Sequence, residues 1–213
     1  MYQQIRILQN VVTRKGSSKV LTFSAPHVLK SILCFANQKY ISRASFCKEL
    51  HMGEGAVRTL ISHLKEYGFV DCIKAGTFLT NKGIRFAKQF HNAMPSQCFL
   101  KKCCMTNGKH NCAILLKKDY VSNIGNGMQQ RDFAILYGAT DSLTLVFRNN
   151  EFVFSGDGVV CFTDEPEIKD QLIKTLEPEE GDVVIITSSD DKFVAEISAI
   201  NTILWTLGTH QKH

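Results

Sequence analysis

The hydrophobic positions in the first 95 residues follow helical spacing before they change period. Apolar residues recur at helical spacing between 28 and 35, where Pro26 suits the first turn of a helix. Ser42 is an N-cap candidate for a short helix over 43–50, and a tight glycine-containing turn precedes a third helix over 53–68. Two helices separated by such a turn predict a helix-turn-helix.

After residue 68 the apolar pattern is typical of a hairpin. Residues 69–74 and 77–80 are rich in β-formers and are joined by Ala75-Gly76, and helical spacing then resumes over 81–93. The order helix, helix, helix, hairpin, helix is that of a winged helix. The sequence therefore predicts a winged helix-turn-helix domain in residues 1–95.

The second half of the chain interleaves strand and helix patterns. We expect strands over 112–118, 142–149, 151–157, 159–163 and 183–189, and helices over 128–138, 165–176 and 192–208. Asn149-Asn150 tolerates the positive φ of a tight turn, so the second and third of these strands should form a hairpin. This pattern predicts an α+β domain over 112–213 with a mixed or antiparallel sheet.

Charge divides the chain near the same place. Residues 1–95 carry 14 Lys and Arg against 4 Asp and Glu, a formal net charge of +10, whereas residues 96–213 carry 11 against 16, a net charge of −5. A basic half suits a polyanion such as DNA, which an acidic half would repel. We therefore place a domain boundary near Pro95-Ser96, followed by a linker over 96–111.

The basic half offers candidates for two kinds of contact with double-stranded DNA. The polar face of the third helix would enter the major groove. Cations at the hairpin tip and just beyond it would contact phosphates, which position a domain without specifying sequence. Arg58 has a structural alternative, an ion pair with Glu54 or Glu66 of its own helix. The candidate DNA-binding residues are Arg43, Arg58, Thr59, Ser62, His63, Lys65, Lys74, Lys82 and Arg85.

Two stretches of the chain resemble a known family. Residues 23–83, with HVLK, GEGAVRTLISHLKEYG and LTNKG in that order, and residues 125–147, with QRDFAILYGA, are similar to an archaeal group of uncharacterised winged-helix proteins. Residues 139–143 depart from that group, since they are Ala-Thr-Asp-Ser-Leu where the group tends to have Ala-x-Gly-Ala-Thr. The resemblance implies a winged helix followed by a GAD-like α+β domain, a fold also seen in some tRNA-handling enzymes.

The second domain contains candidates for a small-molecule site. Gly125-Asn126-Gly127 precedes a predicted helix, where backbone N–H groups could hold an anion or the glycines could simply supply the positive φ of a turn. Arg131 and Asp132 follow on this helix, and they either line a pocket or bond to neighbouring backbone and carboxylate groups. The candidate ligand-binding residues are Gly125, Gly127, Arg131, Asp132, Gly138 and Thr140.

We interpret the eight cysteines as free thiols of a reducing cytoplasm, because the N-terminus does not resemble a secretory signal. Four cysteines and one histidine, residue types that bind zinc, lie in one segment: Cys98, Cys103, Cys104, His110 and Cys112. They lack the spacing of paired CxxC motifs, so we predict no metal and no cofactor. Nearby cations could lower a thiol pKa there, namely Lys101, Lys102 and Lys109. No apolar run is long enough to span a bilayer, so we expect no membrane partner.

Transcriptional regulation is the function that these patterns favour. The first domain would bind double-stranded DNA, and the second would form a homodimer and sense a small-molecule effector. Two alternatives stay open: an RNA-associated or protein-interaction module without DNA sequence specificity, and, less favoured, an enzyme that uses Arg131 and Asp132. The sequence contains no P-loop, zincin or Ser/His/Asp pattern in the required context, so we expect no enzyme.

Overall fold

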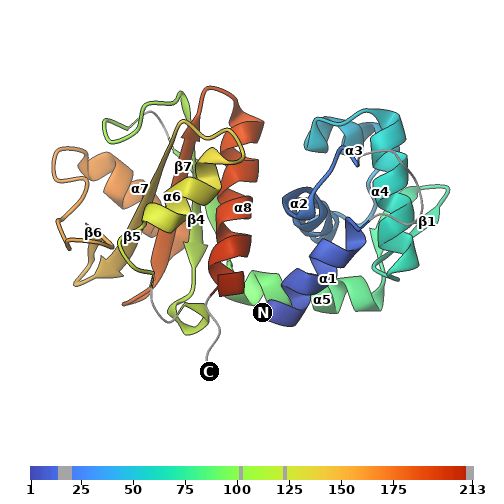
Figure 1. Ribbon diagram of the computed structural model, residues 1–213, viewed down its shortest axis with the longest axis horizontal. Helices are drawn as coiled ribbons and strands as arrows, with labels where there is room; N and C mark the ends of the chain where they lie inside the picture. The colour runs from blue at the N-terminus through green and yellow to red at the C-terminus, as the bar shows by residue number, and fades with distance from the viewer. Residues whose placement is uncertain (14–20, 101–102, 122–123, 210–213) are drawn as a thin grey trace. The chain divides into compact units, whose positions relative to one another are not determined.

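A computed structural model describes residues 1–13, 21–100, 103–121 and 124–209 (Figure 1). The chain divides into two compact units, Met1–Phe90 and His91–His213. Across the described residues it forms eight α-helices, and all strand pairs are antiparallel. The predicted α+β class with an antiparallel sheet is thereby confirmed.

The first unit is mainly helical. Its core comes from apolar stripes, such as Val57, Leu60 and Leu64, which are fully buried because their spacing places them on one face of a helix. The elements are α1 (Tyr2–Val11), α2 (Ala25–Ala36), α3 (Arg43–Leu50), α4 (Glu54–Glu66), β1 (Val70–Ile73), β2 (Gly76–Leu79) and α5 (Asn81–Ala93), the last of which continues into the second unit.

Local signals fix the ends of α3 and α4. The Ser42 hydroxyl accepts the backbone N–H of Ser45 at 3.1 Å, so Ser42 is the N-cap of α3 that the sequence predicts. His51 ends α3 in the left-handed conformation with φ 50°. Gly53 then precedes α4 in an extended conformation. The predicted pair of helices around a short turn is therefore present.

The hairpin β1–β2 is tied to the segment before α3. Thr77 and Ile41 exchange two backbone hydrogen bonds of 3.0 Å each. Gly76 sits beside this bridge, and a Cβ added there would lie only 2.6 Å from the carbonyl oxygen of Ile41. Only glycine permits this approach, which holds the hairpin turn, Lys74-Ala75, near the start of α3.

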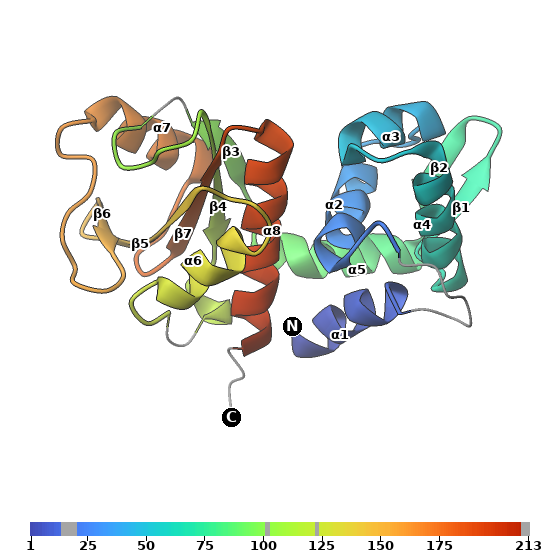
Figure 2. The same ribbon diagram turned by 45° about the horizontal axis from the view of Figure 1, so that its top comes forward.

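The second unit is built on a five-stranded antiparallel sheet with the order β3-β4-β7-β5-β6. Figures 1 and 2 show α6 and α8 on one face of this sheet and α7 on the other. Val183–Ser189 is buried along its whole length because it is the central strand. The elements are β3 (Gln97–Leu100), β4 (His110–Leu116), a 3₁₀ turn (Lys118–Tyr120), α6 (Met128–Ile135), β5 (Asp141–Arg148), β6 (Glu151–Phe154), α7 (Pro166–Leu176), β7 (Val183–Ser189) and α8 (Lys192–Thr209).

The structure differs from the predicted organisation in three places. The chain divides after Phe90 rather than near Pro95, and the predicted linker over 96–111 contains strand β3, which pairs with β4. Residues 2–11 form α1, which the sequence did not predict. The strand predicted over 159–163 is reduced to a single bridge between Val160 and Val153. None of the helices in the described ranges is both long and apolar enough to cross a bilayer.

Candidate nucleic-acid interface

Charged side chains join the starts of α3 and α4. Glu54 Oε1 lies 3.0 Å from Arg58 Nη2, one helical turn along α4, and 3.2 Å from Arg43 Nη1 of α3. The hydrogen bond from Arg58, followed by that from Arg43, lowers the pKa of the Glu54 carboxyl below its usual value. We call this arrangement the Arg43–Glu54–Arg58 triad. The ion pair between Arg58 and Glu54 of the same helix is the structural alternative that the sequence left open for Arg58.

A hollow of about 260 Å³ lies between the start of α3, the middle of α4 and the turn of the hairpin β1–β2. Arg43 and Arg58 line it from the two helices, and Lys74 lines it from the hairpin turn. Ser42 and Thr77 add polar side chains to the lining. We call this feature the basic hollow. It brings together three of the cations that the sequence predicts to contact DNA.

The other cations that the sequence predicts to contact DNA, Lys65, Lys82 and Arg85, differ in their contacts within the structure. Lys65 Nζ lies 2.7 Å from Asp71 Oδ1, and this hydrogen-bonded pair raises the pKa of Lys65. Lys82 Nζ donates to the carbonyl oxygen of Tyr67 at 2.6 Å, so it caps the end of α4. Arg85 is exposed on α5. The sequence did not predict this capping role of Lys82.

The polar face of α4 is smaller than the sequence predicts. Half-buried His63 places Nδ1 2.6 Å from the carbonyl oxygen of Val11, so it fastens α1 to α4 instead of extending toward a groove. Thr59 is half-buried, and its hydroxyl donates to a carbonyl of its own helix at 3.0 Å. Ser62 is exposed, as predicted. Of the predicted contacts on α4, Arg58, Ser62 and Lys65 are therefore the exposed ones, and two of them, Arg58 and Lys65, are held in ion pairs.

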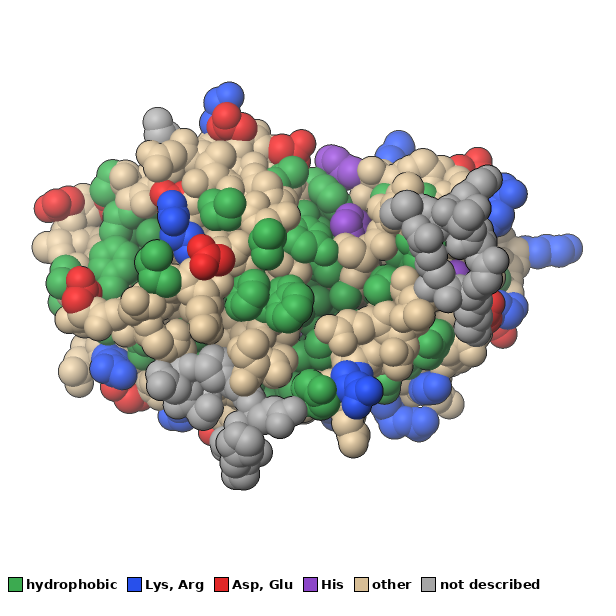
Figure 3. All heavy atoms as spheres, in the orientation of Figure 1, with side chains coloured by type: hydrophobic (Ala, Val, Ile, Leu, Met, Phe, Trp, Pro, Cys, Tyr) green, Lys and Arg blue, Asp and Glu red, His purple; other side chains and the backbone are tan. Residues whose placement is uncertain are grey.

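Figure 3 shows how side chains of each kind are distributed over one face of the two units. Lys and Arg side chains gather over the elements of the first unit, while Asp and Glu side chains are frequent over the second. A group of hydrophobic side chains lies over α6 and α8. The exposed large apolar residues here are Met128 and Ile135 of α6, Leu136 directly after it, and Trp205 of α8.

The ligand-binding candidates of the second unit lie on and around α6. Gly125 and Gly127 have φ values of 62° and 81°, the left-handed conformation that a turn before a helix requires. Arg131 and Asp132 are both exposed on α6. Gly138, with φ 89°, follows the end of the helix. The glycines therefore shape the turns at the two ends of α6, which is the structural alternative considered for the GNG segment.

Thr140, the residue before β5, bonds to the central strand β7. Its backbone N–H and its hydroxyl both donate to the carbonyl oxygen of Ser188, at 2.8 and 3.0 Å. These two bonds extend the pairing of β5 with β7 by one residue. Thr140 therefore has a structural partner and does not join Arg131 and Asp132 in a common set of contacts.

A polar layer between α6 and β5 was missed by the sequence interpretation. Gly127 packs against it, since an added Cβ would lie 3.0 Å from Thr144 Cβ and 3.2 Å from Ser155 Oγ. A side chain of α8 also bonds to α6, since the Asn201 amide donates to the carbonyl oxygen of Phe133 at 2.8 Å. Four buried side-chain atoms of this layer have no hydrogen-bond partner among the described residues: Gln130 Oε1, Ser142 Oγ, Thr144 Oγ1 and Ser155 Oγ.

Two thiols in the described part of the cysteine segment have raised pKa values, where an electropositive site would lower them. The hydrogen bond to Glu165 raises the pKa of Cys104, and burial raises the pKa of Cys98 to about 11. Lys101 and Lys102 lie outside the described residues. In the part of the chain that is described, no three His, Cys, Asp or Glu side chains are grouped to hold a metal ion.

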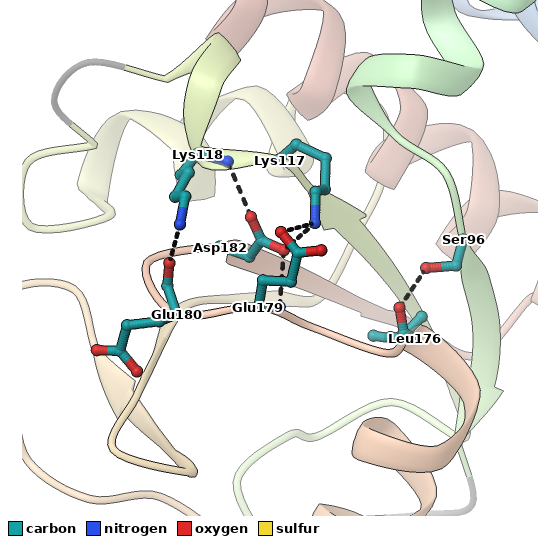
Figure 4. A network of polar contacts seen from close by, with 7 residues as sticks. All are labelled: Ser96, Lys117, Lys118, Leu176, Glu179, Glu180 and Asp182. Carbon is teal, nitrogen blue, oxygen red and sulfur yellow. Dashed lines mark hydrogen bonds and ion pairs between the residues drawn. The ribbon is translucent and has the colours of Figure 1, made fainter.

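A buried carboxylate organises the loop between α7 and β7 (Figure 4). Asp182 is fully buried, and its Oδ2 lies 2.8 Å from Lys117 Nζ. Burial alone would lower the pKa of Lys117, but its hydrogen bonds to Asp182 and Glu179 outweigh burial and raise it. The backbone N–H groups of Lys118 and Glu179 also donate to Asp182, at 3.0 and 2.9 Å. This network is structural, and the sequence did not indicate it.

Fold and site together define a two-unit α+β protein with a basic, largely helical first unit and a sheet-based second unit. Residues 107–207, most of the second unit, match the model of a family described as a domain of unknown function, DUF4443. A hypothetical protein from Pyrococcus horikoshii OT3 has a similar structure, with a TM-score of 0.70 and 26% sequence identity over 85% of this chain and 91% of that chain. No curated protein matches the chain. The two matches support the predicted likeness to uncharacterised archaeal proteins.

Proposed function

We propose that this protein is a cytoplasmic DNA-binding transcriptional regulator whose first unit is a winged helix-turn-helix. In this proposal α4 is the recognition helix and the hairpin β1–β2 is the wing. The second unit, a GAD-like α+β domain, forms a homodimer and senses a small-molecule effector. We assign no catalytic role to Arg131 or Asp132.

The basic hollow is the observation that carries this proposal. Arg43, Arg58 and Lys74 reach it from three separate segments, in a unit whose formal net charge is +10. Lys and Arg side chains that neutralise backbone phosphates supply a large share of the affinity of a protein for duplex DNA, and these three cations converge from two helices and a hairpin. Arg58 is also the most exposed member of the triad, with 68% of its side chain accessible, so it can reach a base edge.

Replacing Arg58 and Lys74 separately tests this proposal. Arg58→Ala should weaken binding to the preferred duplex by about 1–3 kcal/mol and reduce discrimination among sequences, because a base contact is lost. Lys74→Ala should weaken binding to all duplexes alike and reduce the slope of log K against log salt by about one unit, because one phosphate contact is lost. Fluorescence anisotropy over a salt series, on sites selected from random duplexes, measures both effects.

Lys88→Ala is the matched control, since it removes an exposed cation from α5, away from the basic hollow. It should leave both sequence discrimination and the salt slope close to those of the original protein. If the Arg58 and Lys74 variants stay folded and bind duplex DNA as before, the proposal is wrong. Binding that persists only with structured RNA would favour the RNA-associated alternative.

The second unit is expected to join two copies of this chain. Leu136, directly after α6, is 74% exposed and Trp205 of α8 is 45% exposed, and burial of such apolar side chains would stabilise an interface between copies. Two-fold symmetry would present two recognition helices to two half-sites. Sedimentation equilibrium of the full chain should give the mass of a dimer, and Leu136→Glu should shift it toward the monomer. A strictly monomeric mass at high concentration contradicts this part of the proposal.

A further inference from the structure

Glu54 occupies the position at which an anion would meet both arginines of the basic hollow. One carboxylate oxygen accepts hydrogen bonds from two guanidinium groups that belong to different helices, at 3.0 and 3.2 Å. Phosphate oxygens accept the same charge-assisted bonds from guanidinium groups. The triad therefore presents the geometry of an anion complex, with the anion supplied by the protein itself.

The three side chains of the triad are held loosely. Their accessible fractions are 52% for Arg43, 68% for Arg58 and 61% for Glu54. Ion pairs at this exposure contribute little to stability, because water and salt screen them. Exchange of the Glu54 carboxylate for an external anion therefore costs little, while the contact across the triad keeps both arginines near the hollow.

The hollow beside the triad can receive such an anion. Its volume of about 260 Å³ admits a phosphate group, and Lys74 adds a third cation from the side of the hairpin. Ser42 and Thr77 contribute further polar side chains to the lining.

We propose that the basic hollow binds one backbone phosphate of duplex DNA, and that this phosphate replaces the Glu54 carboxylate as the partner of Arg43 and of the Arg58 Nη2 group. The other guanidinium N–H groups of Arg58 remain for the base contact proposed above. The inference rests on the DNA-binding function proposed above. Glu54 is thus a positioning residue in the free protein and a competitor of the ligand in the complex. It makes the affinity for phosphate lower than the three cations alone would give.

Glu54→Gln tests this role, because glutamine keeps the size of the side chain and removes its charge. The variant should bind duplex DNA about threefold to tenfold more tightly, with a salt slope steeper by about one unit, since a competing carboxylate is gone. Glu49→Gln is the matched control: it removes the same charge from an exposed position on α3 that makes no contact with the triad in the structure. Its affinity and salt slope should stay close to those of the original protein.

A titration with inorganic phosphate separates this inference from the proposed function. Side-chain N–H resonances of Arg43 and Arg58 should shift on addition of phosphate, and they should saturate at lower concentration in Glu54→Gln. If duplex DNA is not bound but these shifts occur, the phosphate site stands and the proposed function fails. If duplex DNA is bound and Arg58→Ala weakens it, yet Glu54→Gln behaves like Glu49→Gln, the inference is overturned and the function stands. Absence of arginine shifts in both proteins also overturns it.

Discussion

Asp182→Ala is expected to destabilise the second unit by about 3 kcal/mol, the lower end of the range for removing one partner of a buried ion pair, because Lys117 keeps Glu179 as a second partner at 2.9 Å. The Asp182 side chain has no accessible surface, and its Oδ2 lies 2.8 Å from Lys117 Nζ. It also accepts the backbone N–H groups of Lys118 and Glu179, at 3.0 and 2.9 Å. Alanine would leave one ammonium group and two backbone donors without this acceptor in a place that water reaches poorly. Figure 4 shows that the network joins the end of β4 to the loop before β7.

Urea unfolding followed by the fluorescence of Trp205, which lies in the second unit, measures the loss. Asp170→Ala removes an exposed carboxylate from α7 and should change the free energy of unfolding by less than about 0.5 kcal/mol. Asp182→Asn should lower the free energy of unfolding by an amount between those of Asp182→Ala and Asp170→Ala, because an amide oxygen still accepts a hydrogen bond but carries no charge. Equal unfolding midpoints for Asp182→Ala and the original protein would show that the network does not hold the unit together.

The elements with long, regular apolar patterns were predicted from the sequence. Helix α4 and strand β7 are examples. The buried residues of α4 recur every three or four positions, and β7 begins with an unbroken apolar run and is buried along its whole length. Helix α1 was missed because its buried face is short and consists of Ile5, Leu8 and Val11. Strand β3 has four residues, which is too short for an alternation to stand out, and it is defined by pairing with β4.

The candidate interface was predicted only as a set of residues. The sequence placed Arg58 and Lys74 on a helix and a hairpin, but their convergence on one hollow depends on the bridge between Ile41 and Thr77, which are 36 residues apart. The position of His63 was misjudged for a similar reason. Its partner, the carbonyl of Val11, is 52 residues away and belongs to a helix that the sequence did not predict.

Gly83→Ala should destabilise the first unit by about 3 kcal/mol or more, at or above the upper end of the range for inserting a methyl group where there is no room. A Cβ at Gly83 would lie 2.1 Å from the carbonyl oxygen of Phe69 and 2.9 Å from Leu79 Cδ2. The Phe69 carbonyl cannot simply move away, because it accepts the backbone N–H of Thr80 at 2.9 Å. The added methyl group must therefore push α5 away from the base of the hairpin.

Gly55→Ala is the matched control, because a Cβ at Gly55 has no atom within 4 Å and alanine favours the helical conformation. It should raise the free energy of unfolding by up to about 1 kcal/mol. Since Lys74 depends on the position of the hairpin, duplex DNA binding by any folded Gly83→Ala protein should weaken as Lys74→Ala does, with a lower salt slope. A Gly83→Ala protein as stable as the original would show that α5 and the hairpin do not approach so closely. In that case the hairpin base would not be what fixes Lys74 beside the basic hollow.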